Sequence, residues 1–150
     1  MKERKKIAFF GTPSIAVPSL KKIAALSNYE IVAVGVFPDK KVGRKQILTP
    51  CDVKNSAIEL DLPIIELATK KDLEKFVETN DFDLGIVIAF GMIFSQKVLD
   101  LNTFVNVHFS LLPEWRGASP VQTAILNQQT ISGITWQKMV KKLDAGDVLW

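Results

Sequence analysis

The stretch DLGIVIAFG, residues 83–91, is the most apolar of the strand-like segments and is typical of a buried strand that ends in a glycine turn. Three other runs have a similar form: KKIAFFG (5–11), EIVAVGVF (30–37) and TFVNVHF (103–109). Segments with helical spacing of apolar residues lie between them. Because continuous apolar strands that alternate with helices indicate a sheet covered on both faces, the sequence predicts an α/β fold with a doubly wound, mostly parallel sheet.

The remaining segments complete this alternation. Shorter strands are predicted at 62–67 and 132–140, and a last strand is predicted to begin at 147–150. Helices are predicted over 18–26, 49–60, 69–80, 94–100 and 118–127. We expect three of these helices to begin at capping residues, namely Thr49 before Pro50, Thr69, and Ser119 before Pro120. Residues 38–49 are predicted to form a loop.

Composition limits the class of protein. A chain of 150 residues with 47% hydrophobic content is the size of one domain. No apolar run approaches the roughly 20 residues that span a bilayer, and the apolar run after the basic N-terminus is too short for a signal peptide. The single cysteine, Cys51, cannot form an internal disulfide. We therefore expect a cytoplasmic protein that does not bind membranes.

Positive charge is concentrated in PDKKVGRKQILT (38–49), which accounts for the whole net charge of +3. Its cationic residues are Lys40, Lys41, Arg44 and Lys45. Charge gathered in one segment favours an anionic partner over a uniformly basic surface. A solvated lysine-rich loop remains an equally good interpretation of the charge alone.

The carboxyl ends of the strands are where an open parallel sheet binds its ligands. One histidine and one cysteine cannot supply the usual nitrogen and sulfur ligands of a catalytic metal, so we expect no metal site. Neither a phosphate loop nor a GxGxxG motif is present. Cys51 is predicted to lie near a helix N-terminus, and without a second histidine as its base it is interpreted as an inert small residue.

Asn106 and His108 form a polar pair at the carboxyl end of the predicted strand 103–109. Alternate residues of a strand share a face, so both side chains point the same way while Val105, Val107 and Phe109 point the other. Asn and His together suit a reaction in which negative charge develops on a carbonyl oxygen. A structural histidine is the competing interpretation. Asp144 and Asp147 are both candidates for the carboxylate that orients the imidazole.

The motifs NVH, SLLP, WRG and LDAGD occur in that order in the second half of the chain. With KIAFFGTPSIAVPSL near the start, they resemble the 10-formyltetrahydrofolate-dependent formyltransferases over nearly the whole chain. The resemblance implies a Rossmann-like formyltransferase fold, incomplete at the C-terminus. It also implies that residues 1–150 are the N-terminal part of a single catalytic domain, and that the family's C-terminal β-rich tRNA-binding domain is absent from this sequence.

The resemblance further implies that a formyl group passes from 10-formyltetrahydrofolate to the amine of methionyl initiator tRNA. Asn106, His108 and Asp144 match the family's catalytic residues. Asn106 and a protonated His108 would stabilise the oxyanion, and Asp144 would orient the imidazole. The residues that match folate contacts are Ser110, Leu111, Leu112, Pro113, Ala89, Phe90 and Gly91, with neighbours between Thr135 and Asp144. The basic segment matches the family's element that holds the tRNA acceptor end. Arg44 matches the notable arginine of that element, and Lys40, Lys41 and Lys45 lie beside it in the sequence.

The sequence departs from the family pattern in this basic segment, which reads GRKQIL where GRGKKL is usual. The basic segment still favours tRNA, but the resemblance does not exclude two alternatives, since sugar formyltransferases share the Asn, His, SLLP and RG motifs. The first keeps the folate donor but transfers the formyl group to a nucleotide-sugar amine or to water. The second is a non-catalytic nucleotide- or RNA-binding module that uses the basic segment. We expect a monomer in either case.

Overall fold

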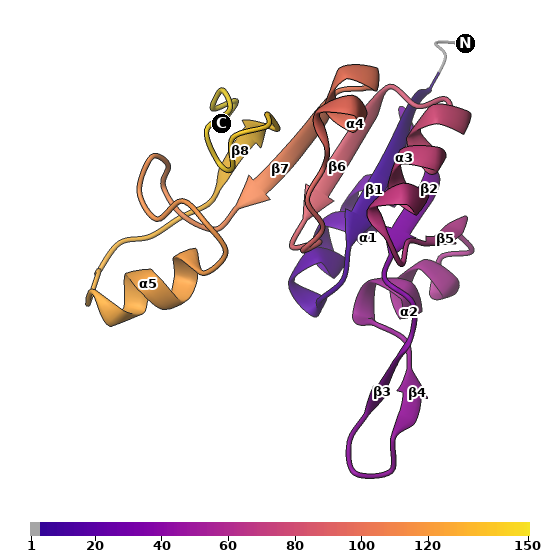
Figure 1. Cartoon of the computed structure of the whole chain (residues 1–150), viewed down its shortest axis with the longest axis horizontal. Helices are drawn as coiled ribbons and strands as arrows, with labels where there is room; N and C mark the ends of the chain where they lie inside the picture. Colours follow the sequence, from indigo (N-terminus) through magenta and orange to yellow (C-terminus); the bar gives the residue numbers. More distant parts are fainter. Residues whose placement is uncertain (1–3) are drawn as a thin grey trace.

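The computed structural model describes residues 4–150, so the first three residues of the basic N-terminal run lie outside it. Its centre is a six-stranded sheet in the order β5-β2-β1-β6-β7-β8 (Figure 1). The first five strands in this order pair in parallel, and β8 pairs antiparallel with β7. The strands are β1 (Lys5–Gly11), β2 (Tyr29–Val36), β5 (Ile64–Glu66), β6 (Leu84–Ile88), β7 (Phe104–His108) and β8 (Thr135–Lys138). The predicted mostly parallel sheet is confirmed.

Helices cover both faces of this sheet. A 3-10 turn at Ser14–Ala16, α1 (Val17–Ala24) and α2 (Asp52–Glu59) pack on one face. On the other face lie α3 (Lys70–Thr79) and α4 (Gln96–Leu101). Because the chain winds outward from β1 in both directions, the strand order switches between β1 and β6, where such folds bind ligands. The fifth helix, α5 (Pro120–Leu126), lies apart from both layers beyond the end of β7 (Figure 1).

The central strand β1 shows why a continuous apolar run forms here. Ala8 and Phe10 belong to the core beneath α3 and α4, whereas Ile7 and Phe9 belong to the core beneath α1 and α2, and all four are at most 2% exposed. Full burial of a side chain as large as Ile or Phe stabilises the folded state by roughly 1.5–3 kcal/mol relative to leaving it exposed. In β6, the ring of Phe104 packs directly against Gly85, and a Cβ atom at position 85 would overlap that ring.

The basic segment is not a loop, as the sequence predicted, but an antiparallel hairpin of β3 (Lys40–Val42) and β4 (Ile47–Thr49). The turn between the two strands contains Gly43 and Gln46, both with positive φ. The hairpin leaves the sheet at the carboxyl end of β2 and projects away from the molecule (Figure 1). The loop prediction was wrong because Lys40 to Val42 and Ile47 to Thr49 pair with each other rather than with the main sheet.

Three helix starts test the predicted caps. Thr69 caps α3 in a capping box with Asp72, as expected. Helix α2 begins later than predicted, since Cys51 occupies the N-cap and its Sγ accepts from the Lys54 amide at 3.4 Å. Thr49 is instead the last residue of β4, where it pairs with Lys40. Ser119 occupies the N-cap of α5, but its side chain makes no capping bond.

The predicted last strand at 147–150 does not form a named strand. The segment turns back beside β8 and makes one isolated antiparallel bridge, between Gln137 and Val148, and main-chain bonds to Trp136. Within residues 4–150, no helix is long and apolar enough to cross a membrane.

Candidate active site

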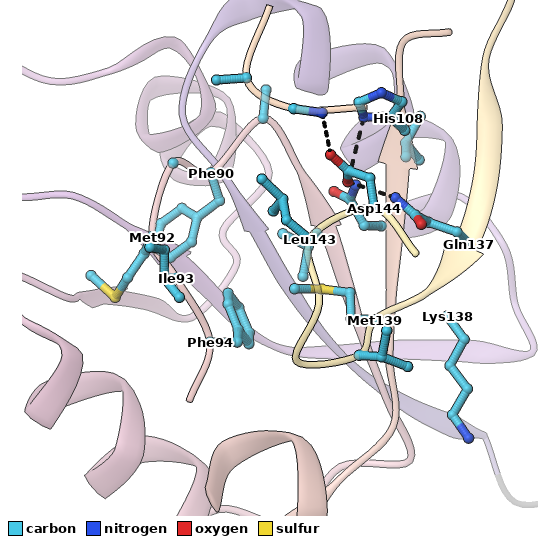
Figure 2. Close-up of a pocket in the computed structure, with 18 of the residues that line it drawn as sticks. Phe90, Met92, Ile93, Phe94, His108, Gln137, Lys138, Met139, Leu143 and Asp144 are labelled. Atoms are coloured by element: carbon cyan, nitrogen blue, oxygen red, sulfur yellow. Dashed lines mark hydrogen bonds and ion pairs between the residues drawn. The ribbon is translucent and has the colours of Figure 1, made fainter. Parts of the chain in front are cut away.

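A cavity of about 560 Å³ opens at the carboxyl ends of β6 and β7 (Figure 2). Its walls come from the segment that follows β6, the end of β7, the turn at Gly117, and the segment from Gln137 to Asp144. The volume is that of a typical small-molecule site. The cavity therefore lies at the sheet edge that the strand pattern identified.

Strand β7 brings Asn106 and His108 to this cavity. Both line it, and Val107, which also borders the cavity, packs into the core beneath α1 and α2, as the alternation predicted. Asn106 is partly exposed, and His108 is only 5% exposed. In the antiparallel register, Asn106 is opposite Gln137 and His108 is opposite Thr135. The polar pair of β7 therefore faces a polar pair of β8.

Each ring nitrogen of His108 faces an oxygen. Nε2 lies 2.9 Å from the main-chain carbonyl of Trp115, and Nδ1 lies 3.6 Å from Oδ1 of Asp144 (Figure 2). A carbonyl is an acceptor, so Nε2 donates to it, while Nδ1 faces the carboxylate at a distance longer than a hydrogen bond. The surroundings of His108 thus suit a ring that carries positive charge during part of a reaction.

Asp144 is the carboxylate that the fold places beside His108. Its side chain is 7% exposed. Oδ2 accepts from the Gly117 amide at 2.8 Å, and Oδ1 accepts from Nε2 of Gln137 at 2.7 Å. Asp147, the other candidate, is exposed and meets β8 through its main-chain carbonyl, which accepts from the Lys138 amide. Of the two aspartates that residue pattern alone left open, the structure places Asp144, the one that the family resemblance matched, beside His108.

The rest of the cavity is largely apolar. Figure 2 shows Phe90, Met92 and Phe94 on one side and Met139 and Leu143 facing them. Of the residues expected to contact a folate, Ala89, Phe90 and Gly91 line this cavity. Such a surface suits a flat, uncharged ring system whose polar edge reaches the histidine.

The other expected folate contacts, residues 110–113, do not line the cavity. Ser110 is fully buried, and its hydroxyl donates to the Glu114 carbonyl. The Thr135 hydroxyl donates to the Ser110 carbonyl at 2.7 Å and accepts from the Leu112 amide at 3.1 Å. Leu111 and Pro113 are exposed. In this structure the loop holds the Trp115 carbonyl against His108, and its contact with a folate remains a prediction.

The basic hairpin is connected to the cavity through aromatic rings. Nζ of Lys40 lies 5.4 Å from the centre of the Phe37 ring, and Phe37 stacks on Phe90 at 4.8 Å and 18°. Phe90 in turn lines the cavity. The remaining cationic residues of the hairpin, Lys41, Arg44 and Lys45, are exposed. The hairpin therefore presents its charge to solvent while its base touches the cavity wall.

Several groups of this site were missed by the sequence-based reasoning. The Trp115 carbonyl and the Gly117 amide belong to the main chain, which residue type does not reveal. Thr135 and Gln137 fell within the range expected to neighbour the folate but were not singled out. Both are polar residues on the same side of a predicted strand, and both are buried. Within residues 4–150, no three His, Cys, Asp or Glu side chains are grouped as a metal site requires.

Comparison with known proteins identifies the family. A family model described as Formyl transferase matches residues 5–150. A methionyl-tRNA formyltransferase of Listeria innocua is 44% identical over 96% of this chain and 47% of its own length. That of Trichormus variabilis is also 44% identical, over 96% of this chain and 45% of its own length. The chain thus spans about half the length of these curated relatives.

Solved structures agree on the fold. A glycinamide ribonucleotide transformylase of Symbiobacterium toebii has a TM-score of 0.80 at 13% identity, covering 100% of this chain and 73% of its own. A sugar N-formyltransferase of Shewanella has a TM-score of 0.65 at 20% identity, covering 97% of this chain and 55% of its own. The Rossmann-like formyltransferase fold is confirmed, and the chain belongs to the formyl transferase family.

Proposed function

We propose that the protein transfers a formyl group from 10-formyltetrahydrofolate to the amine of methionyl initiator tRNA. The observation that carries this proposal is the buried His108, held between the Trp115 carbonyl and Asp144 at the polar end of an apolar cavity. The match to the formyl transferase family and the 44% identity to methionyl-tRNA formyltransferases support the same reaction. The domain assignment, a catalytic N-terminal part, is included in this proposal.

The reaction joins the acceptor nitrogen to the formyl carbon and breaks the bond from that carbon to the donor nitrogen. Negative charge develops on the formyl oxygen, and Asn106, whose amide lines the cavity, is placed to donate to it. Nε2 of His108 bonds to the Trp115 carbonyl in this structure, so that carbonyl must first move aside. His108 could then donate a second hydrogen bond, or move the proton that the acceptor nitrogen loses and the departing nitrogen gains. Asp144 keeps the imidazole in one orientation.

A folate fits the cavity better than a fully polar donor would. An apolar part of the wall is formed by Phe90, Met92, Phe94, Met139 and Leu143, and the linked side chains of His108, Asp144 and Gln137 also line the cavity. Apolar contact would bind the ring system, and the main chain near Ala89 and Gly91 would supply hydrogen bonds. The donor supplies the activated formyl group, and the protein supplies orientation and charge stabilisation.

The basic hairpin is the feature that favours a nucleic acid as the acceptor. Four cationic residues stand on it, and their exposure allows contact with phosphates. The hairpin also leaves the sheet at the carboxyl edge where the cavity opens, so that one acceptor could reach both (Figure 1). The sequence-based expectation of a cytoplasmic monomer stays a prediction.

The test is a formyl-transfer assay with the full-length protein. Labelled 10-formyltetrahydrofolate is offered with initiator methionyl-tRNA, with a nucleotide-linked amino sugar, or without any acceptor. We expect label on the methionyl-tRNA alone. Transfer only to the sugar or only to water would assign a different acceptor, and tRNA binding without any transfer would support a non-catalytic module.

A further inference from the structure

Gln137 is the residue of β8 whose side chain is bonded to Asp144. It is 2% exposed and lines the cavity between the end of β7 and Asp144 (Figure 2). A long polar side chain is seldom buried to this extent unless its amide is used. Gln137 uses one half of its amide, since Nε2 donates to Oδ1 of Asp144 at 2.7 Å.

The oxygen that Gln137 binds is also the one that faces the histidine. Oδ1 of Asp144 lies 3.6 Å from Nδ1 of His108, and Oδ2 is held by the Gly117 amide. Both carboxylate oxygens are therefore fixed by donors from two different segments. With Gln137 removed, one donor would remain, and the carboxylate could rotate about it and away from the ring.

The other half of the Gln137 amide is unused. Its Oε1 is buried and has no hydrogen-bond partner among residues 4–150. Asn106 is directly opposite Gln137 in the β7–β8 ladder, and its side chain makes no hydrogen bond within the described part of the chain. Opposed residues of an antiparallel pair have Cβ atoms about 4.5–5.5 Å apart, so their amides can meet. The two amides do not bond to each other in this structure, so the bond from Nε2 to Asp144 is the one that carries a role.

We infer that Gln137 is a positioning residue whose Nε2 fixes Asp144 toward His108. The carboxylate oxygen nearest the ring is thereby held in place, and Asp144 in turn orients the imidazole. This inference rests on the proposed function, because it concerns the geometry of that reaction.

A double-mutant cycle in the full-length protein tests this role. Gln137→Met keeps the length of the side chain but removes the polar contact with Asp144, and we expect kcat to fall on the order of tenfold, since small displacements of positioned groups can cost up to about 100-fold. The KM values for the formyl donor and for methionyl-tRNA should stay within about twofold, because Gln137 acts through other residues. In an Asp144→Asn background, the same substitution should lower kcat much less.

A matched control is available on α4. Gln96 donates from Nε2 to Oδ1 of Asp100 at 2.7 Å, which is the same kind of bond at the same length, but in an exposed position. Gln96→Met should leave kcat and both KM values unchanged. Gln137→Glu provides a second variant of nearly unchanged volume, in which a carboxylate replaces the donor and repels Asp144. We expect its kcat to fall at least as far as that of Gln137→Met.

Two outcomes would overturn the inference. A wild-type kcat in Gln137→Glu would show that the donor is not needed, even if Gln137→Met failed to fold. An equal loss from Gln137→Met in the wild-type and Asp144→Asn backgrounds would show a general packing effect. Either result requires an active wild-type protein, so failure of the inference is distinct from failure of the proposed function, in which the wild type itself transfers no formyl group to tRNA.

Discussion

The cavity around His108 and the β3–β4 hairpin belong to the same edge of the sheet, but they are built in opposite ways. In the cavity, His108 and Asp144 are buried and bonded to neighbours from several segments. In the hairpin, every residue of β3 and β4 is exposed, including Val42, Ile47 and Leu48. The cavity is held in one arrangement, whereas the hairpin has little tertiary contact beyond its base.

The difference indicates a division of tasks. Groups that stabilise developing charge are most effective when their positions are fixed before the reaction. A surface that binds a large anion gains from exposed cations that can adjust to the phosphates. We therefore expect substitutions in the cavity to change kcat, and substitutions in the hairpin to change the KM for the acceptor.

The largest effect is expected from His108→Ala. It removes the proton donor of the site, and loss of general acid–base catalysis typically costs about 10²–10⁴-fold. We expect a fall in kcat of this size, with the KM for methionyl-tRNA unchanged, in steady-state kinetics of the full-length protein. Wild-type turnover in this variant would rule out the proposed chemistry, and a rise in the acceptor KM alone would remove the distinction between the two regions.

Arg44→Ala should show the reverse pattern. It removes one exposed cation from the hairpin, and we expect roughly a tenfold rise in the KM for methionyl-tRNA, from the loss of one charge-assisted bond. The kcat and the KM for the formyl donor should not change. The slope of log KM against log salt should become smaller by about 1, the value for one lost phosphate contact.

Lys22→Ala is the matched control for this prediction. Lys22 is an exposed cation on α1, outside the hairpin, and its removal changes the net charge by the same amount. We expect no change in the KM for tRNA. An equal rise in both variants would mean that the tRNA responds to overall charge and not to the hairpin.

Phe37→Leu tests the connection between the two regions. Phe37 stacks on Phe90 of the cavity and lies beneath Lys40 of the hairpin. Aromatic pairs contribute about 0.5–1.5 kcal/mol beyond their burial, so we expect a few-fold rise in the KM values of both substrates. Phe82→Leu breaks another stacked pair, with Phe76 in the core, and should lower the melting temperature without changing either KM.

The smallest effect is expected from Lys54→Met at the base of the hairpin. Nζ of Lys54 lies 2.6 Å from a carboxylate oxygen of Asp39 and 2.6 Å from one of Glu66. The hydrogen bond with Asp39, and after it the one with Glu66, raises the pKa of the Lys54 ammonium above its ordinary value. We expect a loss of roughly 1 kcal/mol or less in urea unfolding.

The sign of the pKa shift sets the pH dependence of this loss. A raised folded-state pKa means that the stabilisation is fully present below the ordinary value of 10.5 and is lost as the pH rises through the folded pKa. The difference in stability between wild type and Lys54→Met should therefore stay constant from neutral pH to about pH 9 and shrink above 10.5. A difference that already shrinks between about pH 7 and 9 would contradict this assignment.

Sequence patterns predicted the parts of the molecule that depend on residue type and spacing. The apolar runs of β1, β2, β6 and β7 and the cap at Thr69 follow local rules, and each is present. The alternation in β7 placed Asn106 and His108 on one face. These features could be predicted because a buried strand and a capping box each leave a distinctive local pattern.

The parts that could not be predicted depend on the main chain or on distant partners. The family resemblance distinguished Asp144 from Asp147, but the Gly117 amide and the Gln137 side chain that hold Asp144 in place do not follow from spacing. The hairpin depends on pairing between exposed residues, which carries no hydrophobic signal. The start of α2 moved to Cys51 because Thr49 is occupied in β4.

The loop that closes over His108 has a consequence for measurement. His108 is the one histidine in the 150 residues, and its Nε2 is covered by the Trp115 carbonyl. Exchange of that ring proton with water therefore requires the loop to move aside. In a sample labelled with ¹⁵N only at histidine, the exchange rate of this proton would measure how often the loop opens, and a slower rate with donor present would indicate that the ligand holds the loop closed.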